Sequence, residues 1–174
     1  MKKVEHGKTF DRNAANPPAF EIFHNTVTEG YPKHWHTAIE IIMPTRGEYE
    51  VVVGKDSYNL KEGDIIMINS GVVHGMRFVS QGERIVMLVE PGCVENQEEM
   101  ETIFLRLPAI YFKKEDEEDP FYLFLRSQIL ELVREYDNEG AVMTHRICTG
   151  LKELFSEFGR KGFSDANAQN TFGA

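Results

Sequence analysis

The sequence has little cysteine and no long apolar run. Its two cysteines, Cys93 and Cys148, are far apart and have no Cys-x-x-Cys spacing. This argues against a disulfide framework or a zinc knot, and it predicts two free thiols. No run of 18 or more apolar residues exists, so no transmembrane helix is expected, and the lysines at the N-terminus precede no apolar stretch of a signal peptide. We therefore expect a cytoplasmic protein that does not enter a membrane.

The sequence also has fewer basic than acidic residues. The 174 residues contain 19 Lys and Arg against 28 Asp and Glu, a net charge of −9. Residues 91–174 alone have 9 basic and 16 acidic side chains, so most of the excess lies in the second half of the chain. An acidic surface repels phosphate groups, and this chain by itself is therefore not expected to bind nucleic acid tightly.

The chain is long enough for one domain with a hydrophobic core, and 41% of its residues are apolar. Between residues 20 and 91, short strand patterns alternate with turn signals every 8 to 12 residues, as in an antiparallel sandwich or barrel. The expected strands are Phe20–His24, His34–Met43, Glu48–Val53, Ser57–Leu60, Ile65–Ile68 and Arg84–Val89.

After residue 118 the apolar period changes from two to between three and four residues. Asp119 and Pro120 form a typical helix start, because aspartate caps free N–H groups and proline at the first position loses no hydrogen bond. We expect helices over 120–137 and 141–158, with Gly159 ending the second, and an antiparallel pairing of the two. Residues 160–174 have no periodicity and are interpreted as a linker to a further segment.

Three histidines and a glutamate form the most informative pattern. His34, His36 and Glu40 share one parity, so on a single strand they would point to one face, and His74 follows from a later strand. Imidazole nitrogens with a carboxylate suit a divalent transition metal such as Zn, Ni, Fe or Mn. A His-x-His pair taken alone is equally compatible with half-buried polar side chains. The same-face glutamate and the spaced glycines favour a site.

This segment resembles the two motif blocks of the cupin superfamily. The first block is matched at His34, His36, Glu40 and Gly47, and the second at Gly63, Gly71 and His74. Two positions depart from the pattern, since Asn69 stands where proline is usual and Phe78 where many enzymes of the superfamily have asparagine. The resemblance implies a mainly β fold, a double-stranded β-helix or jelly-roll barrel with the four ligand-type residues at its mouth, followed here by the helical pair.

Within that superfamily, three segments resemble the N-terminal sensing domains of AraC-type transcription regulators. They are Tyr-Pro-Lys-His-Trp-His at 31–36, Glu-Ile-Ile at 40–42, and the Tyr58-x-Leu60-x-x-Gly63-Asp64-Ile65 run. The resemblance implies a barrel over 1–92, a helical segment over 93–159 that forms a homodimer, and the linker 160–174. It also implies that DNA is bound only by a C-terminal domain absent from this chain.

A sensor of this kind requires a pocket for a small-molecule effector. Barrel mouths provide mostly apolar cavities, and the candidate ligand-binding residues are Trp35, Tyr49, Val51, Met76 and Phe78. For each of them, core packing is the alternative. The His/Glu set then binds either a metal or polar groups of the effector. A metal-dependent cupin enzyme, of dioxygenase or isomerase type, is the rival interpretation, although no further acid, base or nucleophile stands out.

The helices also predict an interface. Their bulky apolar set is broader than a single contact with the barrel requires, so part of it, including Leu151 and Leu154, is expected to be buried against a second copy. The alternative is that the whole set packs on its own barrel. The full set is Phe121, Phe124, Leu125, Ile129, Leu132, Val133, Leu151, Leu154, Phe155 and Phe158.

Overall fold

The computed structural model describes residues 19–26, 30–93, 108–116, 118–138 and 140–161. These residues form nine strands, two short 3₁₀ helices and two α-helices. In chain order they are β1 Phe20–Asn25, β2 Tyr31–His34, β3 Ile39–Arg46, β4 Tyr49–Val53, β5 Asp56–Leu60, β6 Ile65–Ile68, β7 His74–Phe78, β8 Glu83–Val89, η1 Pro91–Cys93, β9 Ala109–Phe112, η2 Lys114–Asp116, α2 Pro120–Asp137 and α3 Met143–Lys161.

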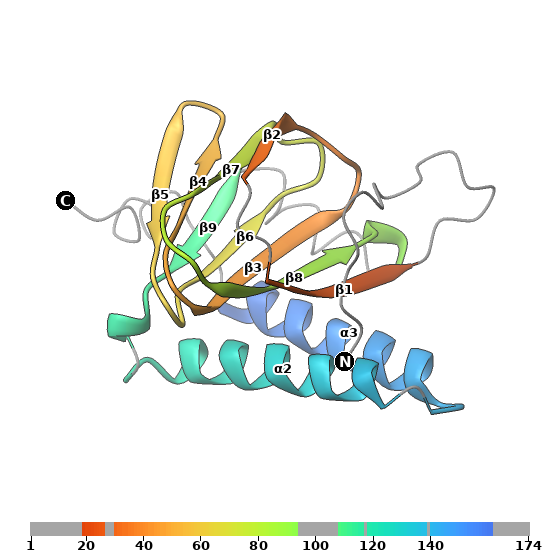
Figure 1. Ribbon diagram of the computed structural model, residues 1–174. Helices are drawn as coiled ribbons and strands as arrows, with labels where there is room; N and C mark the ends of the chain where they lie inside the picture. Colours follow the sequence, from red (N-terminus) through yellow and green to blue (C-terminus); the bar gives the residue numbers. More distant parts are fainter. Residues whose placement is uncertain (1–18, 27–29, 94–107, 117, 139, 162–174) are drawn as a thin grey trace.

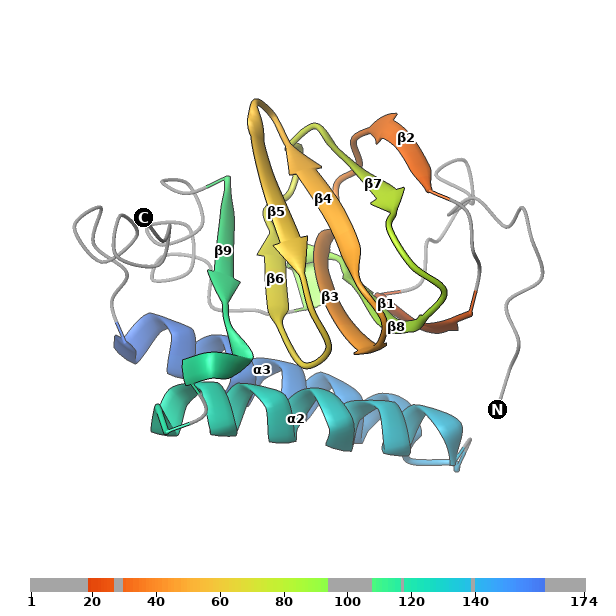
Figure 2. The same ribbon diagram turned by 60° about the vertical axis from the view of Figure 1, so that its left-hand side comes forward.

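The strands form two antiparallel sheets that face each other. The larger sheet has the order β1-β8-β3-β6-β9, and the smaller one has the order β2-β7-β4-β5. Figures 1 and 2 show the two layers, with both helices lying side by side beneath the larger sheet. The expected mainly β barrel with a C-terminal helical pair is confirmed.

The larger sheet is buried on both faces, as the alternation of strand side chains allows. On β3, Ile39 and Ile41 point toward the helices, whereas Ile42 belongs to the core between the sheets. Leu125, Ile129, Leu151 and Phe155 of the helices pack against the outer face and are at most 1% exposed. Each such side chain contributes about 1.5–3 kcal/mol by leaving water. The helices are therefore an integral part of the core.

This burial affects the homodimer interface that was predicted from the helix sequences. Of the ten bulky helix residues, eight are buried on the barrel of their own chain, and Phe121 and Phe124 are half-buried. Leu151 and Leu154 are both 0% exposed, so they are not available to a second copy. The expectation that these two residues form an interface is wrong, because sheet β1-β8-β3-β6-β9 offers the helices a wider apolar face than the sequence pattern indicated.

The start of α2 and the end of α3 are in contact. Asp119 accepts a hydrogen bond from the Phe121 backbone N–H at 2.8 Å, as the predicted N-cap requires, and Lys161 Nζ lies 2.7 Å from Asp119 Oδ2. Gly159 does not end α3, which starts at Met143 and continues to Lys161. Its φ is not positive, so it continues the helix. From residue 162 on, the predicted linker lies outside the described residues.

Two strand assignments also differ from the sequence expectation. The predicted strand His34–Met43 is divided into β2 and β3, which lie in different sheets. Pro44, the residue after the predicted strand, lies within β3, where the register shifts between Pro44 and Arg46. In addition, β9 adds a strand to the larger sheet from within 93–159, so the barrel extends beyond residue 92.

Among the described residues, no helix combines the length and apolar character needed to cross a membrane.

Candidate functional site

The structure brings His34, His36, Glu40 and His74 together at one end of the barrel. Each offers one ligand atom, and these atoms all lie within 4.8 Å of one another. His34 ends β2, His36 lies in the following connection, Glu40 is the second residue of β3, and His74 begins β7. The reason given for this convergence, a shared face of one strand, is wrong. The side chains come from two facing sheets, and the chain crosses between those sheets after His34.

Backbone contacts position this crossing. His34 and His74 are register partners on β2 and β7. The Gly71 N–H donates to the His36 carbonyl at 2.8 Å from a backbone with φ of +76°, a conformation that favours glycine. A Cβ on Gly75 would lie 3.1 Å from backbone atoms of β2, so the absence of a side chain there allows β2 to approach β7 beside the site.

All three imidazoles are oriented by the same kind of contact. Nδ1 of His34 lies 2.9 Å from the Pro32 carbonyl, Nδ1 of His36 lies 2.9 Å from the Ala38 carbonyl, and Nδ1 of His74 lies 2.8 Å from the Val72 carbonyl. A carbonyl only accepts, so each Nδ1 donates. A neutral imidazole then has its lone pair on Nε2. Such hydrogen bonds to backbone carbonyls are typical of histidines that bind metals.

Glu40 is the common partner of two of these rings. Its Oε2 lies 3.0 Å from His36 Nε2 and 2.8 Å from His74 Nε2. Burial by itself raises the pKa of this carboxyl, but the hydrogen bonds from His36 and His74 outweigh it and lower the pKa to about 2. Two lone pairs cannot face an ionised carboxylate without a positive charge between them. The cluster is therefore a site for cations, either protons on the rings or a metal ion.

His34 completes the cluster on its solvent side. It is half-buried, and its ring centroid lies 4.5 Å from that of His74. Burial is the main cause that lowers its pKa from 6.5. A neutral His34 is thus favoured at pH 7, which is the form that a metal requires.

The donor set fits a divalent transition metal. Three imidazole nitrogens and one carboxylate oxygen are the ligands that Zn, Ni, Fe and Mn accept, at about 2.0–2.2 Å. Ligand atoms around such an ion lie roughly 3–4 Å apart, so separations of up to 4.8 Å require only a small contraction. A bound ion would act there as a Lewis acid with positions left for a ligand.

The five predicted ligand-binding residues divide into two groups. Tyr49, Val51 and Met76 belong to the core between the sheets and are at most 6% exposed. Trp35 is 55% exposed and Phe78 is 38% exposed. Core packing, the alternative left open for these residues, therefore describes the first group.

A shallow hollow of about 490 Å³ lies on the outer side of the smaller sheet. Met76 and Phe78 contribute to it, but none of the four residues of the His/Glu cluster lines it, so the hollow is distinct from that cluster. The lining residues are Gly30, Tyr31, Pro32, Lys33, Val52, Gly75, Met76, Arg77 and Phe78.

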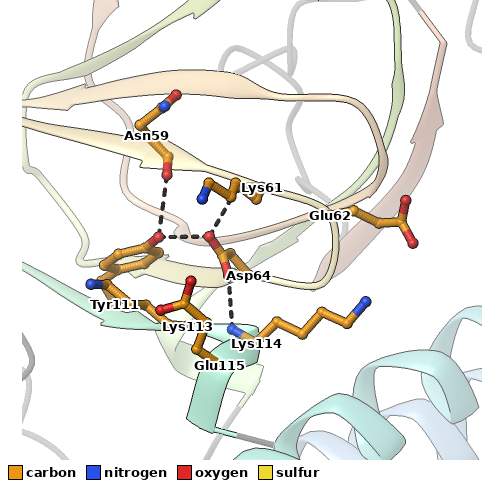
Figure 3. A pocket seen from close by; sticks show the side chains of 8 residues that line it. All are labelled: Asn59, Lys61, Glu62, Asp64, Tyr111, Lys113, Lys114 and Glu115. Carbon is orange, nitrogen blue, oxygen red and sulfur yellow. Dashed lines mark hydrogen bonds between the residues drawn. The ribbon is translucent and has the colours of Figure 1, made fainter.

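A second hollow, of about 430 Å³, surrounds Asp64 (Figure 3). The Asp64 carboxylate accepts hydrogen bonds from the backbone N–H groups of Lys61 and Lys114, at 2.9 and 2.8 Å, and from the Tyr111 hydroxyl at 2.6 Å. These contacts connect the turn before β6 to β9 and η2. They satisfy the carboxylate, and they give the Gly63-Asp64 motif a structural role.

The departure at Asn69 has a structural reason as well. Its backbone N–H donates to the Pro108 carbonyl at 3.0 Å, a bond that proline could not make, and its side chain accepts from the Ser70 N–H at 2.7 Å. Asn69 thereby holds the end of β6 to the residue before β9.

One contact in the structure, between the two cysteines, was not predicted from the sequence. Cys93 and Cys148 are free thiols, as expected, but their Sγ atoms are only 3.4 Å apart. Cys93 is in η1 and Cys148 is on α3, so the contact joins the barrel to the helical pair. Their separation of 55 residues gave no signal of this contact.

Comparison with known proteins gives one family. Residues 25–90 match the Cupin domain family. No curated protein sequence is similar enough to match. Among solved structures, apo ToxT from Vibrio cholerae is similar with a TM-score of 0.56 and 11% identity, over 84% of this chain and 58% of that one.

Two further structures are similar over smaller parts of the chain. The SPY1581 protein of unknown function from Streptococcus pyogenes has 18% identity over 41% of this chain and 63% of that one, with a TM-score of 0.38. Oxalate decarboxylase OxdC from Bacillus subtilis has 18% identity over 41% of this chain and 21% of that one, with a TM-score of 0.39. The chain thus spans less than two thirds of ToxT and of the SPY1581 protein. Residues 25–90 thus match the Cupin domain family, and the described strands of that segment share a core with the two C-terminal helices.

Proposed function

We propose that this chain is the effector-sensing and dimerisation domain of a cytoplasmic bacterial transcription regulator of the AraC type. The observation on which this rests most is the integration of α2 and α3 into the barrel core, because a minimal cupin enzyme has no need of them. The likeness to ToxT supports a fold that includes more than the barrel, since it extends over 84% of the chain. In this proposal DNA is bound only by a domain outside these residues.

Strand β3 gives the sensor a physical basis. Glu40 points to the cluster at the barrel mouth, whereas its neighbours Ile39 and Ile41 pack toward the helices and are 3% and 1% exposed. A ligand or metal that moves Glu40 therefore acts on the strand that supports α2 and α3. Tightly packed interiors transmit such displacements. We propose that the effector, a small molecule held at the mouth with or without a divalent metal, changes the helices by this connection.

The proposed homodimer uses a different helix face from the one inferred from the sequence. Leu123 and Leu130 of α2 are 50% and 39% exposed, and they lie seven residues apart on one side of the helix. A second copy that covers this side would give a two-fold interface.

Sedimentation of the wild-type chain at micromolar concentration tests this interface. We expect a dimer that dissociates in the Leu123→Glu, Leu130→Glu double variant with unchanged circular dichroism. The control variant Lys152→Glu, which alters an exposed side chain of α3, should remain a dimer. A strictly monomeric wild type would contradict the proposed homodimer.

The regulatory function itself is tested by fusing residues 1–174 to a DNA-binding domain that represses a reporter only as a dimer. We expect repression by the fusion, its loss with the Leu123→Glu, Leu130→Glu pair, and a change in repression with the Glu40→Gln variant. A fusion that never represses would argue against a dimerising sensor.

A metal-dependent cupin enzyme remains the second candidate, favoured by the complete set of three histidines and a glutamate. The other described histidines lie elsewhere, His24 on β1 and His145 on the exposed side of α3. Oxygen consumption or substrate turnover by the metal-loaded protein that is lost in Glu40→Gln would decide for the enzyme.

A further inference from the structure

The barrel contains a buried cation that the cupin pattern does not explain. Arg84 of β8 is 1% exposed, and its Nε and both terminal nitrogens have no hydrogen-bond partner. No described carboxylate forms an ion pair with it. Arg84 faces the smaller sheet, because the next residue, Ile85, packs toward the helices. Across the interior, its guanidinium carbon lies 4.7 Å from the centre of the Tyr49 ring.

An unpaired arginine in this position is strongly unfavourable. A guanidinium does not lose its proton in proteins, so Arg84 cannot become neutral as a buried lysine or histidine can. The Tyr49 ring compensates for part of the charge on one face by a cation–π contact. It leaves the in-plane N–H groups without acceptors, and burial of unpaired charges and donors is destabilising. The chain thus supplies a set of donors without supplying the acceptor.

Tyr49 has the same deficiency. Its side chain is 0% exposed, and its hydroxyl has no hydrogen-bond partner. The turn before β8 closes over this hydroxyl, since a Cβ on Gly82 would lie 2.9 Å from it. Tyr49 and Arg84 therefore form one group of unsatisfied donors between the sheets. We call it the Arg84–Tyr49 pair.

The pair is separate from the His/Glu cluster. Val53, at the other end of β4 from Tyr49, is the register partner of His74, and four residues of strand correspond to roughly 13 Å. Asn25, the register partner of Arg84, is a buried polar residue beside the pair, and the other surrounding side chains named here are apolar. Val51 and Leu60 are fully buried, Val86 is half-buried beside them, and Phe78, the register partner of Tyr49, is 38% exposed.

We propose that the Arg84–Tyr49 pair binds the carboxylate of a small organic acid. A carboxylate accepts two parallel hydrogen bonds from the guanidinium edge, and the phenol hydroxyl offers a further donor. The apolar side chains around the pair suit the hydrocarbon part of such an acid. This inference goes beyond the proposed function, in which the effector is held at the barrel mouth, and it adds a separate site for an organic acid between the sheets.

Thermal unfolding with sodium hexanoate, benzoate, inorganic phosphate or chloride at constant ionic strength tests the proposal. We expect hexanoate or benzoate to raise the melting temperature of the wild type as their concentration increases, and chloride to have no such effect. Arg84→Met should abolish the shift and melt no lower than the wild type without added acid, because an unpaired charge is removed. Arg77→Met, at an exposed arginine of the adjacent β7, should behave as the wild type.

Arg84→Lys keeps the charge but loses the planar fork, so it should weaken carboxylate binding by about tenfold or more. If Arg84→Met does not fold, the Nε–H resonance of Arg84 in the wild type decides, and it should move on addition of hexanoate or benzoate. The proposal is overturned by an unmoved resonance, by an equal shift in Arg84→Met, or by stabilisation with phosphate alone. These outcomes do not depend on dimerisation or on repression, so they are distinguishable from failure of the regulatory function.

Discussion

Glu40 determines the chemistry of the barrel mouth, because one of its oxygens contacts two imidazole nitrogens. The backbone carbonyls at Ala38 and Val72 hold the Nδ1 protons of these rings, so the Nε2 atoms meet the carboxylate only when a cation lies between them. The same four residues can therefore exchange protons for a metal ion. A substitution of Glu40 is therefore expected to change both the metal affinity of the protein and its stability in acid.

Replacement of Glu40 by glutamine should weaken metal binding. The amide keeps the size of the side chain but removes the negative charge at the centre of the cluster, and loss of even an outer partner of a metal ligand costs about 10–100-fold in affinity. We expect Glu40→Gln to exceed that range in titration calorimetry with zinc or manganese. Glu83→Gln is the matched control, since Glu83 pairs with Arg46 at the other end of the sheet. Equal metal affinities in the two variants would show that Glu40 does not contribute to metal binding.

Acid should destabilise the metal-free protein through the same residue. The pKa of Glu40 is about 2 in the fold, against an ordinary value of 4.5. Because the folded pKa is depressed, the stabilisation is complete above about pH 4.5 and is lost as the pH falls toward about 2. Urea unfolding between roughly pH 6 and pH 3 should show a steeper decline in the free energy of unfolding for the wild type than for Glu40→Gln. If the free energy of unfolding fell equally with pH in both proteins, Glu40 would not be the residue that causes the acid destabilisation.

Individual elements show how far the sequence determined the fold. The periods of two and then between three and four residues, with the Asp119-Pro120 start, predicted most of the strands and both helices. They could not predict that the segment after His34 changes sheets, because crossing depends on contacts such as the hydrogen bond from Gly71 to His36. Residue types and motif spacing identified the four cluster residues, but the Arg84–Tyr49 pair involves no motif and arises only when two sheets face each other.

The contact between η1 and α3 gives a prediction at the scale of elements. The Sγ atoms of Cys93 and Cys148 are 3.4 Å apart, and a disulfide requires about 2.05 Å, so a modest movement would join them. Burial is the main cause that raises the pKa of Cys93 to about 12, with a contribution from Cys148, and this slows thiolate reactions at neutral pH.

We expect oxidised glutathione at alkaline pH to form this internal disulfide, with release of two reduced glutathione molecules. Intact mass spectrometry should show loss of two hydrogens, and both thiols should resist alkylation. Cys93→Ser should instead stop at a mixed disulfide with glutathione. A wild type that also stops at mixed disulfides would show that η1 and α3 do not approach closely enough.

At the scale of the whole molecule, the net charge bears on whether this chain binds DNA by itself. The net charge is −9, and 16 of the 28 acidic residues lie in 91–174. Proteins that bind DNA gain most of their non-specific affinity by neutralising phosphates with Lys and Arg, which gives a strong dependence on salt. An excess of carboxylates opposes this contribution over the whole surface.

The isolated chain should therefore not be retained by duplex DNA at micromolar concentration, at either low or physiological salt. Gel-shift titration at about 50 mM and about 150 mM salt checks this, because any phosphate-driven binding should be strongest at the lower concentration. Fusion of the chain to a basic DNA-binding domain is the positive control, and it should restore retention without a change in the barrel. Salt-sensitive retention of the chain alone would mean that its own surface binds DNA, and the division between a sensing domain and a separate DNA-binding domain would then be wrong.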